Sequence, residues 1–201
     1  HSEWMSRSEK AVASLPRAKS ECTMAHGQLI VGGNGWSLLH VATQMGLVET
    51  VKLALEKCAD QEVALKAKAR DFSMTCSWTP LMLAVLGQGR DPEILRLLIS
   101  AGEASWCGSG LPPVRERNEE NWDALWLASN EGHTELVGML LQAGADPFLC
   151  DMQGVNCLMA AALAGQVATS QLLMDTMFGD DRTAGHHMLT TLSTVLFCGL
   201  M

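Results

Sequence analysis

The sequence has little of the material from which β-sandwiches are usually built. Its 201 residues include no tyrosine, four phenylalanines and six tryptophans, so aromatic residues make up 5% of the chain. The hydrophobic content is nevertheless 48%, carried mainly by Leu, Ala, Met and Val. This composition favours packed helices over a β-sandwich, and it is too apolar for a chain that is disordered throughout.

Positive charge is scarce in the second half of the chain. Residues 1–117 carry 13 Lys and Arg against 12 Asp and Glu, whereas residues 118–201 carry Arg182 alone against ten acidic residues. Because phosphate binding needs a basic face, a nucleic-acid partner is not expected. Lys66, Lys68 and Arg70 form a short basic stretch. We interpret it as a solvated helix extension or as a contact for an acidic partner or a lipid headgroup.

The seven cysteines are dispersed and contain no Cys-x-x-Cys pair. Zinc-ligand spacing and a compact disulfide framework are therefore not visible, and no metal site is predicted. Dispersed thiols are typical of small core residues in a reducing compartment, which favours the cytoplasm or the interior of an organelle. The chain begins with His1 rather than Met, which allows for a removed targeting segment.

Long hydrophobic runs and catalytic motifs are also missing. Three stretches lack Asp, Glu, Lys and Arg, but polar residues or glycine interrupt each of them, so no transmembrane span is expected. They are residues 22–48, 152–174 and 183–201. The sequence has no Gly-rich phosphate loop, G-x-S-x-G or H-E-x-x-H motif. A chain without enzymatic activity or cofactor is predicted.

A repeated pattern organises the chain instead. Leu125 and Leu158 are 33 residues apart, and Gly132 and Gly165 share that period. Two earlier segments show the same order of a turn, a short apolar helix and a second, Leu-rich helix. Neither helix of such a pair can bury its apolar side alone, so neighbouring pairs are expected to stack into a continuous core.

These segments resemble the ankyrin repeat, whose pattern runs through T-P-L-H-x-A-A, Gly-His and G-A-D. The matching residues are Leu39-His40 and Ala42; Thr79-Pro80-Leu81 and Ala84; Leu125, Ala128, Gly132-His133 and Gly144-Ala145-Asp146; and Gly154, Leu158, Ala161-Ala162 and Gly165. The resemblance implies an all-α helical solenoid of about four repeats, and structural rather than catalytic roles for His40 and His133. The expected repeats are 33–60, 71–104, 117–150 and 151–182. They lie between a degenerate N-terminal cap (1–32), in which residues 2–26 are expected to form a helix pair, and a C-terminal capping half-repeat (183–201).

The first two connections exceed the repeat period. Leu39 and Leu81 are 42 residues apart, and Leu81 and Leu125 are 44 apart. Most of the extra residues fall between Asp60 and Trp78 and between Gly102 and Trp122. Two long inter-repeat loops are therefore predicted. Insertions in solenoids collect on one face, which is often the binding face.

Three tryptophans occupy one repeat position, because Trp36, Trp78 and Trp122 each precede an aligned leucine by three residues. Val155 takes the same place in the fourth repeat. In ankyrin-repeat proteins this position usually faces the concave binding surface, so the resemblance implies an apolar ladder there. The alternative is that each tryptophan covers its own loop. Neighbouring contact positions of the family are Gln44, Met45, Glu119, Glu120, Asn130, Glu131, Met152 and Gln153. Trp106 is a further candidate, because an indole on a Gly-, Ser- and Pro-rich segment is costly to expose and is expected to dock on a partner.

The predicted function is a non-catalytic protein–protein interaction module that binds a protein partner on its concave and loop face. The alternative is a permanent structural or linker subunit of a large assembly, including peripheral association with an organellar membrane complex. The uncharged C-terminal segment favours this alternative. A reversible adaptor should be stable alone, whereas a permanent subunit should need its partners.

Overall fold

The computed structural model describes residues 22–25, 28–31, 35–58, 60–70, 76–87, 91–106 and 112–179. The C-terminal half-repeat expected at 183–201 and most of the N-terminal cap lie outside these ranges. The four predicted repeats lie largely within them.

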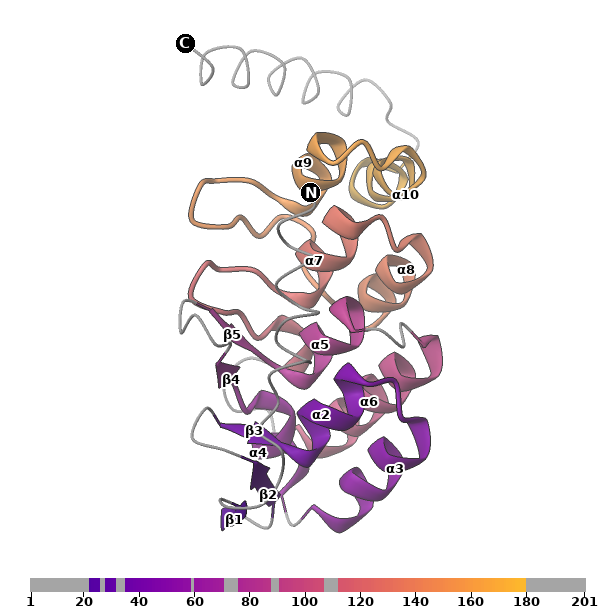
Figure 1. Ribbon diagram of the computed structural model, residues 1–201. Coiled ribbons are helices and arrows are strands. Elements are labelled where there is room, and N and C mark those ends of the chain that lie inside the picture. The colour runs from indigo at the N-terminus through magenta and orange to yellow at the C-terminus, as the bar shows by residue number, and fades with distance from the viewer. Residues whose placement is uncertain are drawn as a thin grey trace.

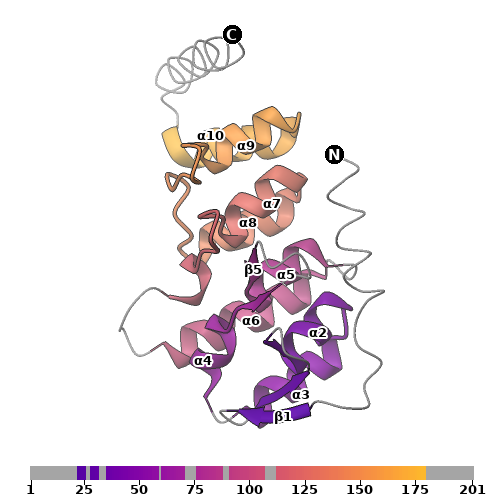
Figure 2. The same cartoon turned by 60° about the vertical axis from the view of Figure 1, so that its left-hand side comes forward.

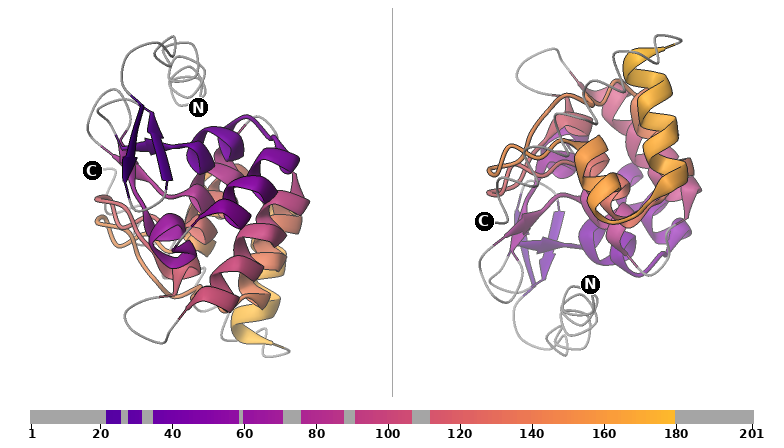
Figure 3. Two further views of the ribbon diagram at one scale, coloured as in Figure 1. Left: turned by 90° about the horizontal axis from the view of Figure 1, so that it is seen from below. Right: turned by 90° about the horizontal axis from the view of Figure 1, so that it is seen from above.

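Helix pairs stack in sequence order along the described chain (Figure 1). The first helices of the pairs form an inner layer, and the second helices form an outer layer. The inner helices are α2 (Leu38–Gln44), α5 (Pro80–Leu86), α7 (Ala124–Glu131) and α9 (Cys157–Leu163). The outer helices are α3 (Val48–Lys57), α6 (Pro92–Ser105), α8 (Thr134–Gln142) and α10 (Val167–Phe178). Hairpins project beside the inner layer (Figures 1 and 3). The prediction of an all-α solenoid is confirmed.

Every inner helix begins at a polar residue in the same repeat position. Each side chain accepts a hydrogen bond from a backbone N–H of the first turn, which has no partner within the helix. In the first repeat, His40 completes a capping box with Ser37. The four capping residues are Ser37, Thr79, Asp123 and Asn156.

The core repeats with the helices. The aligned leucines and the alanines three residues after them are buried in all four repeats, and the alanines allow the inner helices to pack closely. These residues are Leu39, Leu81, Leu125 and Leu158, with Ala42, Ala84, Ala128 and Ala161. The turn after α7 needs glycine, because Gly132 has a φ of 78°. An added Cβ there would also lie 2.2 Å from the side-chain oxygen of Gln166.

The N-terminal cap differs from the expected helix pair. Residues Cys22–Ala25 form strand β1, which pairs antiparallel with β2 (Gln28–Val31). Strand β2 in turn pairs with β3 (Trp36–Ser37), directly before α2. The helical expectation is wrong for 22–25, because the β-branched run Ile30-Val31 favours a strand that extends the first hairpin. The rest of the expected cap pair lies outside the described residues.

The first long connection is not a free loop. It contains helix α4 (Gln61–Lys66) and strand β4 (Ala69–Arg70), which pairs with β5 (Ser77–Trp78) (Figure 2). Ala64 and Leu65 are buried, and α4 packs against α6. The expectation of a loop is wrong over 61–70. The adjacent apolar residues Ala64 and Leu65 bury their side chains against the second repeat, which stabilises helix α4.

The basic stretch is largely paired within the chain. Lys66 forms an ion pair with Glu62 at 2.7 Å. The ammonium group of Lys68 donates to the carbonyl oxygen of Arg117 and lies 3.9 Å from a carboxylate oxygen of Glu116. Lys68 therefore ties the inserted segment to the second long connection, and Lys66 is paired within α4, which argues against their use as a contact for a lipid or an acidic partner.

The second long connection is also partly ordered by packing. Its described portion contains the short 3-10 helix η1 (Pro113–Arg115), whose Pro113 and Val114 are buried. Helix η1 packs against α6 and α4. This part of the predicted loop is therefore packed between the second and third repeats. Residues 107–111 lie outside the described ranges.

Candidate partner-binding surface

The tryptophans at the shared repeat position are mostly buried. Trp36 is 7% exposed and Trp78 is 8% exposed. The indole Nε1 of Trp36 donates to the carbonyl oxygen of Arg70 at 2.9 Å, which ties the first hairpin to the inserted strand β4. An exposed ladder of three tryptophans is therefore not formed. For Trp36 and Trp78 the structure supports the alternative interpretation, in which each indole covers a neighbouring loop.

A different aromatic stack replaces the predicted ladder. The ring centroids of Trp78 and Trp122 are 6.5 Å apart, and those of Trp122 and Trp126 are 4.9 Å apart with an interplanar angle of 13°. The indole Nε1 of Trp126 donates to the carbonyl oxygen of Val155 at 3.1 Å. The stack thus links the second, third and fourth repeats. Trp126 was not predicted; it lies in the first turn of α7, and Trp122 lies two residues before that helix begins.

Glu119 is engaged within the protein. Its carboxylate accepts hydrogen bonds from the backbone N–H and the hydroxyl of Ser77 at 2.8–2.9 Å. Burial alone would raise the pKa of Glu119, but these hydrogen bonds, one from its own backbone N–H and the charge of Lys68 together lower it. The side chain joins two adjacent hairpins, so its structural role is clearer than its predicted role in partner contact.

The fourth hairpin presents exposed side chains at its tip. The carboxylate of Asp151 accepts hydrogen bonds from the backbone N–H groups of Gln153 and Val155, which closes the turn. The backbone N–H of Met152 donates to the carbonyl oxygen of Glu120 at 3.2 Å, so this tip rests on the preceding one. Met152 is 66% exposed and Gln153 is exposed, whereas Val155 is partly buried.

The far ends of the inner helices contribute a second row. Met45, which ends α2, is 40% exposed, but the neighbouring Gln44 is buried and unsuited to partner contact. Asn130 and Glu131, at the end of α7, are partly exposed and hydrogen-bond to each other through their side chains at 3.3 Å. From the predicted set we define as the inner surface the polar and Met residues of the hairpin tips and inner-helix ends that are exposed or partly exposed and whose side chains are not bound to another repeat. It consists of Met45, Glu120, Asn130, Glu131, Met152 and Gln153. Glu119 is also exposed, but its carboxylate is bound to Ser77.

The electrostatic field over the later repeats is negative. Residues 118–179 contain eight acidic residues and no lysine or arginine. Asp123 is buried below this surface, and desolvation by burial raises its pKa from 3.8 to about 6 despite the hydrogen bond from the N–H of Trp126. Its Oδ2 atom has no hydrogen-bond partner among the described residues. A surface of this charge attracts a basic partner over distances up to a Debye length.

Burial shifts the pKa values of His40 and Cys157 away from those of reactive groups. Burial lowers the pKa of His40 to about 4, so the ring is neutral, and its Nε2 contacts the carbonyl oxygen of Ala67 at 3.0 Å. This confirms the expected structural role of His40. Burial, with the nearby charge of Asp123, raises the pKa of Cys157 to about 12, which makes the thiol a poor nucleophile.

Two further observations concern metals and membranes. In the described ranges, no group of three or more His, Cys, Asp or Glu is arranged to hold a metal ion. The helices of the same ranges are too short or too polar to span a bilayer.

Trp106 belongs to a different part of the molecule. It ends the outer helix α6 and is 41% exposed. Its indole lines a hollow whose other lining residues come from α5, α6, η1 and the end of α8. None of these residues belongs to the inner surface. The sequence indicated an unusual indole in a Gly- and Pro-rich segment, but not the hollow beside it.

Comparison with known proteins agrees with this architecture. A family model described as "Ankyrin repeats (3 copies)" matches residues 7–108 and 91–184. The Ankyrin repeat and KH domain-containing protein mask-1 of Caenorhabditis elegans is 35% identical over 98 residues, which cover 48% of this chain and 3% of that protein. Ankyrin repeat domain-containing protein 63 of Homo sapiens is 31% identical over 137 residues, covering 66% of this chain and 31% of that protein. Its Mus musculus counterpart is 30% identical over 135 residues, covering 66% and 30%.

The chain thus spans about a third or less of these relatives. Ankyrin repeats indicate a protein–protein interaction module. Stacked helix pairs with hairpins beside the inner layer, and a family model that covers most of the sequence, lead to one conclusion: the chain belongs to the ankyrin-repeat family.

Proposed function

We propose that the chain is a non-catalytic module that binds a protein partner on the inner surface, and that this partner presents a basic, partly apolar face. The observation that carries the proposal is the exposure of Met152 at a hairpin tip, in a region of the chain that has acidic residues but no lysine or arginine. A flexible apolar side chain surrounded by uncompensated negative charge suits a partner that brings both an apolar contact and cations.

The rim of this surface supports the same choice of partner. Glu120, whose carbonyl oxygen accepts from the backbone N–H of Met152, and Glu131, at the end of α7, have no ion pair among the described residues. Such charges at a rim mainly steer association and set its salt dependence, whereas Met45 and Met152 would contribute to the apolar contact. We expect the association rate to fall as the salt concentration rises, and the dissociation rate to change little.

Site-specific crosslinking tests this proposal. A photo-crosslinking amino acid at Gln153 should capture a partner, whereas the same group at Leu53, exposed on the outer helix α3, should not. With that partner, Met152→Ala should weaken binding about fivefold, in the range of an interface contact of ordinary strength. Leu53→Ala is the matched control and should leave affinity unchanged. Equal effects of the two variants, or capture from position 53 alone, would contradict the proposal.

The permanent-subunit alternative has one observation in its favour. Leu163 and Val167, at the turn of the last described helix pair, are both strongly exposed. A chain whose end repeat needs covering by another subunit should aggregate or unfold when it is purified alone at low concentration. A monomeric, cooperatively unfolding chain would support the reversible adaptor.

We also propose a reducing intracellular compartment. Cys150 is an exposed free thiol and Cys157 a buried one, and an exposed thiol is more compatible with a reducing environment. Thiol quantification on the protein isolated from its native source tests this, because an oxidising compartment would leave Cys150 blocked or paired.

A further inference from the structure

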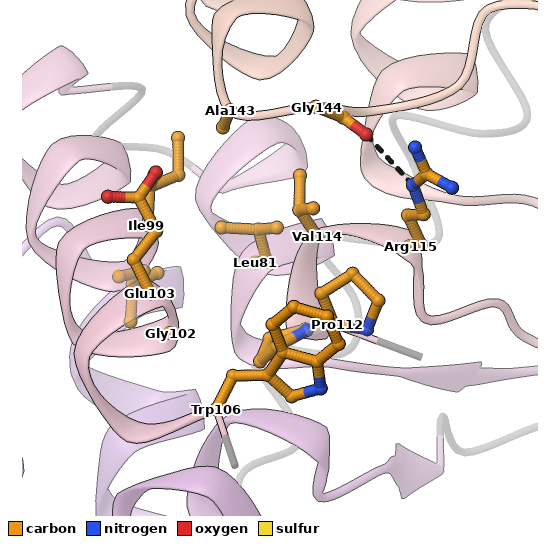
Figure 4. Close-up of a pocket in the computed structure, with 12 residues that line it drawn as sticks. Leu81, Ile99, Gly102, Glu103, Trp106, Pro112, Val114, Arg115, Ala143 and Gly144 are labelled. Carbon is orange, nitrogen blue, oxygen red and sulfur yellow. Dashed lines mark hydrogen bonds between the residues drawn. The ribbon is translucent and has the colours of Figure 1, made fainter. Parts of the chain in front are cut away.

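A hollow of about 370 Å³ lies between the second and third repeats, on the outer side of α5 (Figure 4). Its walls come from α6, η1 and the end of α8. Most of the lining is apolar, supplied by Leu81, Leu98, Ile99, Trp106, Pro113 and Val114. This size falls in the usual range of pockets that hold a small ligand or a few side chains of a peptide.

The walls are held in place by specific contacts. Helix η1 packs closely on α6, since an added Cβ at Gly102 would already be in van der Waals contact with Cγ of Pro113, at 3.4 Å. The Nε of Arg115 donates to the carbonyl oxygen of Gly144 at 2.8 Å, which ties η1 to the end of α8. A preformed pocket loses little entropy on binding.

The charges at the edge are arranged asymmetrically. Figure 4 shows the carboxylate of Glu103 and the guanidinium of Arg115 at opposite sides of the hollow. Arg115 uses Nε for its bond to Gly144, and its two terminal nitrogens have no carboxylate partner among the described residues. A planar guanidinium with donors to spare favours an incoming carboxylate on that side. The negative charge of Glu103 disfavours a carboxylate on the opposite side of the hollow.

We propose that this hollow is a second docking site, which takes a peptide segment of a partner protein carrying a bulky apolar residue next to an acidic one. The apolar side chain enters between Trp106 and Val114, and the acidic side chain binds the terminal nitrogens of Arg115. The half-exposed indole supplies the large, rigid contact area that is common at binding hot spots. The repulsion from Glu103 fixes the direction of the segment.

This site is independent of the inner surface. None of its lining residues belongs to the inner surface, and it sits at the outer helix α6 rather than at the hairpin tips. The required charge is also opposite, since the inner surface is proposed to attract cations and this hollow an anion. Failure of one proposal therefore leaves the other standing.

Selection from a random peptide library displayed on phage provides the probe. The whole chain is immobilised, and binders that also bind a Trp106→Ala variant are removed. The remaining peptides should share a Leu, Phe or Met within two positions of an Asp or Glu. A library that yields no such peptides, or a consensus without an acidic residue, would overturn the proposal.

The best peptide is then synthesised together with an analogue in which Gln or Asn replaces its acidic residue. Trp106→Ala should weaken binding of the acidic peptide at least tenfold, and Met152→Ala, on the inner surface, should leave it within twofold. Arg115→Gln should weaken the acidic peptide about fivefold and the neutral analogue less than twofold. If Arg115→Gln weakened both peptides equally, the loss would come from a loosened η1, and the assigned contact would be wrong.

Discussion

The carboxylate of Glu119, in the third repeat, accepts hydrogen bonds from both the backbone N–H and the hydroxyl of Ser77, which lies 42 residues earlier in the second repeat. The contact joins two hairpins directly, in addition to the packing of the helices behind them. Solenoid stability depends on such contacts between neighbouring repeats, because each repeat touches only its neighbours. A residue predicted to contact a partner thus contributes to the interface between repeats.

Glu119→Gln should lower the free energy of unfolding by about 0.5–1.5 kcal/mol, because it replaces the charge-assisted hydrogen bonds between the exposed Glu119 and the buried Ser77 with neutral ones. Since the folded-state pKa of Glu119 lies below its ordinary value of 4.5, its contribution is present above that pH and is lost as the pH falls through the lowered folded-state pKa. Urea titration measures the change. Glu120→Gln is the control, and an equal loss there would contradict this role for Glu119.

Asp123→Asn should stabilise the protein at neutral pH. Burial raises the pKa of Asp123 from 3.8 to about 6, so the folded state favours the protonated form. The contribution of Asp123 to the free energy of unfolding is fully present below pH 3.8, where the carboxyl group is protonated in both the folded and the unfolded state. As the pH rises from 3.8 through about 6, about 3 kcal/mol of this free energy is lost. The asparagine variant should lack this loss, because asparagine does not ionise. It should also keep the helix cap, since Asn156 caps the equivalent helix α9.

The reciprocal variant tests the same explanation. Asn156→Asp should introduce a loss of stability over the same acidic pH range, since Asn156 is also buried. Urea midpoints across this range for wild type and both variants provide the measurement. Identical pH profiles for the three proteins would show that burial of Asp123 does not set its titration.

Trp36→Ala should lower the free energy of unfolding by about 3–5 kcal/mol, the usual range for removal of a buried aromatic side chain. Trp106→Ala, at a half-exposed site, should cost less than about 1 kcal/mol. Where the alanine variant fails to fold, Trp36→Phe isolates the lost hydrogen bond to the carbonyl oxygen of Arg70, which should cost about 1–2 kcal/mol. A folded Trp36 variant with normal stability but lost partner binding would restore the ladder interpretation.

Cysteine labelling should separate two thiols that lie only seven residues apart. Cys150 is exposed, whereas burial raises the pKa of Cys157 to about 12. Iodoacetamide at mildly alkaline pH should therefore modify Cys150 at least about 100-fold faster than Cys157, because the thiolate is the reactive form. Peptide mass spectrometry gives both rates. In concentrated urea the two rates should converge, and similar rates in the native protein would contradict the burial of Cys157.

The repeats were predictable from the sequence because their signal is periodic. Leu125 and Leu158, one repeat apart, take equivalent buried positions, and Asp123 and Asn156 cap equivalent helices. The insertion helix α4 was harder to recognise, since it has no counterpart in the other described repeats. Its buried pair Ala64-Leu65 becomes apolar packing only where α6 is available beside it.

The candidate site was less predictable for a physical reason. The position of Trp36 and Trp78 in the repeat was clear, but both contact the inserted strand β4. Its Arg70 accepts the hydrogen bond of the Trp36 indole, and its Ala69 pairs with Trp78. Met152 at a hairpin tip has no such cover and is exposed. The hollow at Trp106 depends on the meeting of α6, η1 and α8, which no local pattern indicates.

Hydrogen–deuterium exchange of the chain with and without the captured partner tests most directly whether partner binding uses the inner surface. We expect slower exchange at the hairpin tips around Glu120 and Met152 and at the inner-helix ends around Met45 and Glu131, with the outer helix α3 unchanged. Protection confined to α3 and the other outer helices, with unchanged exchange at the hairpin tips, would contradict this expectation.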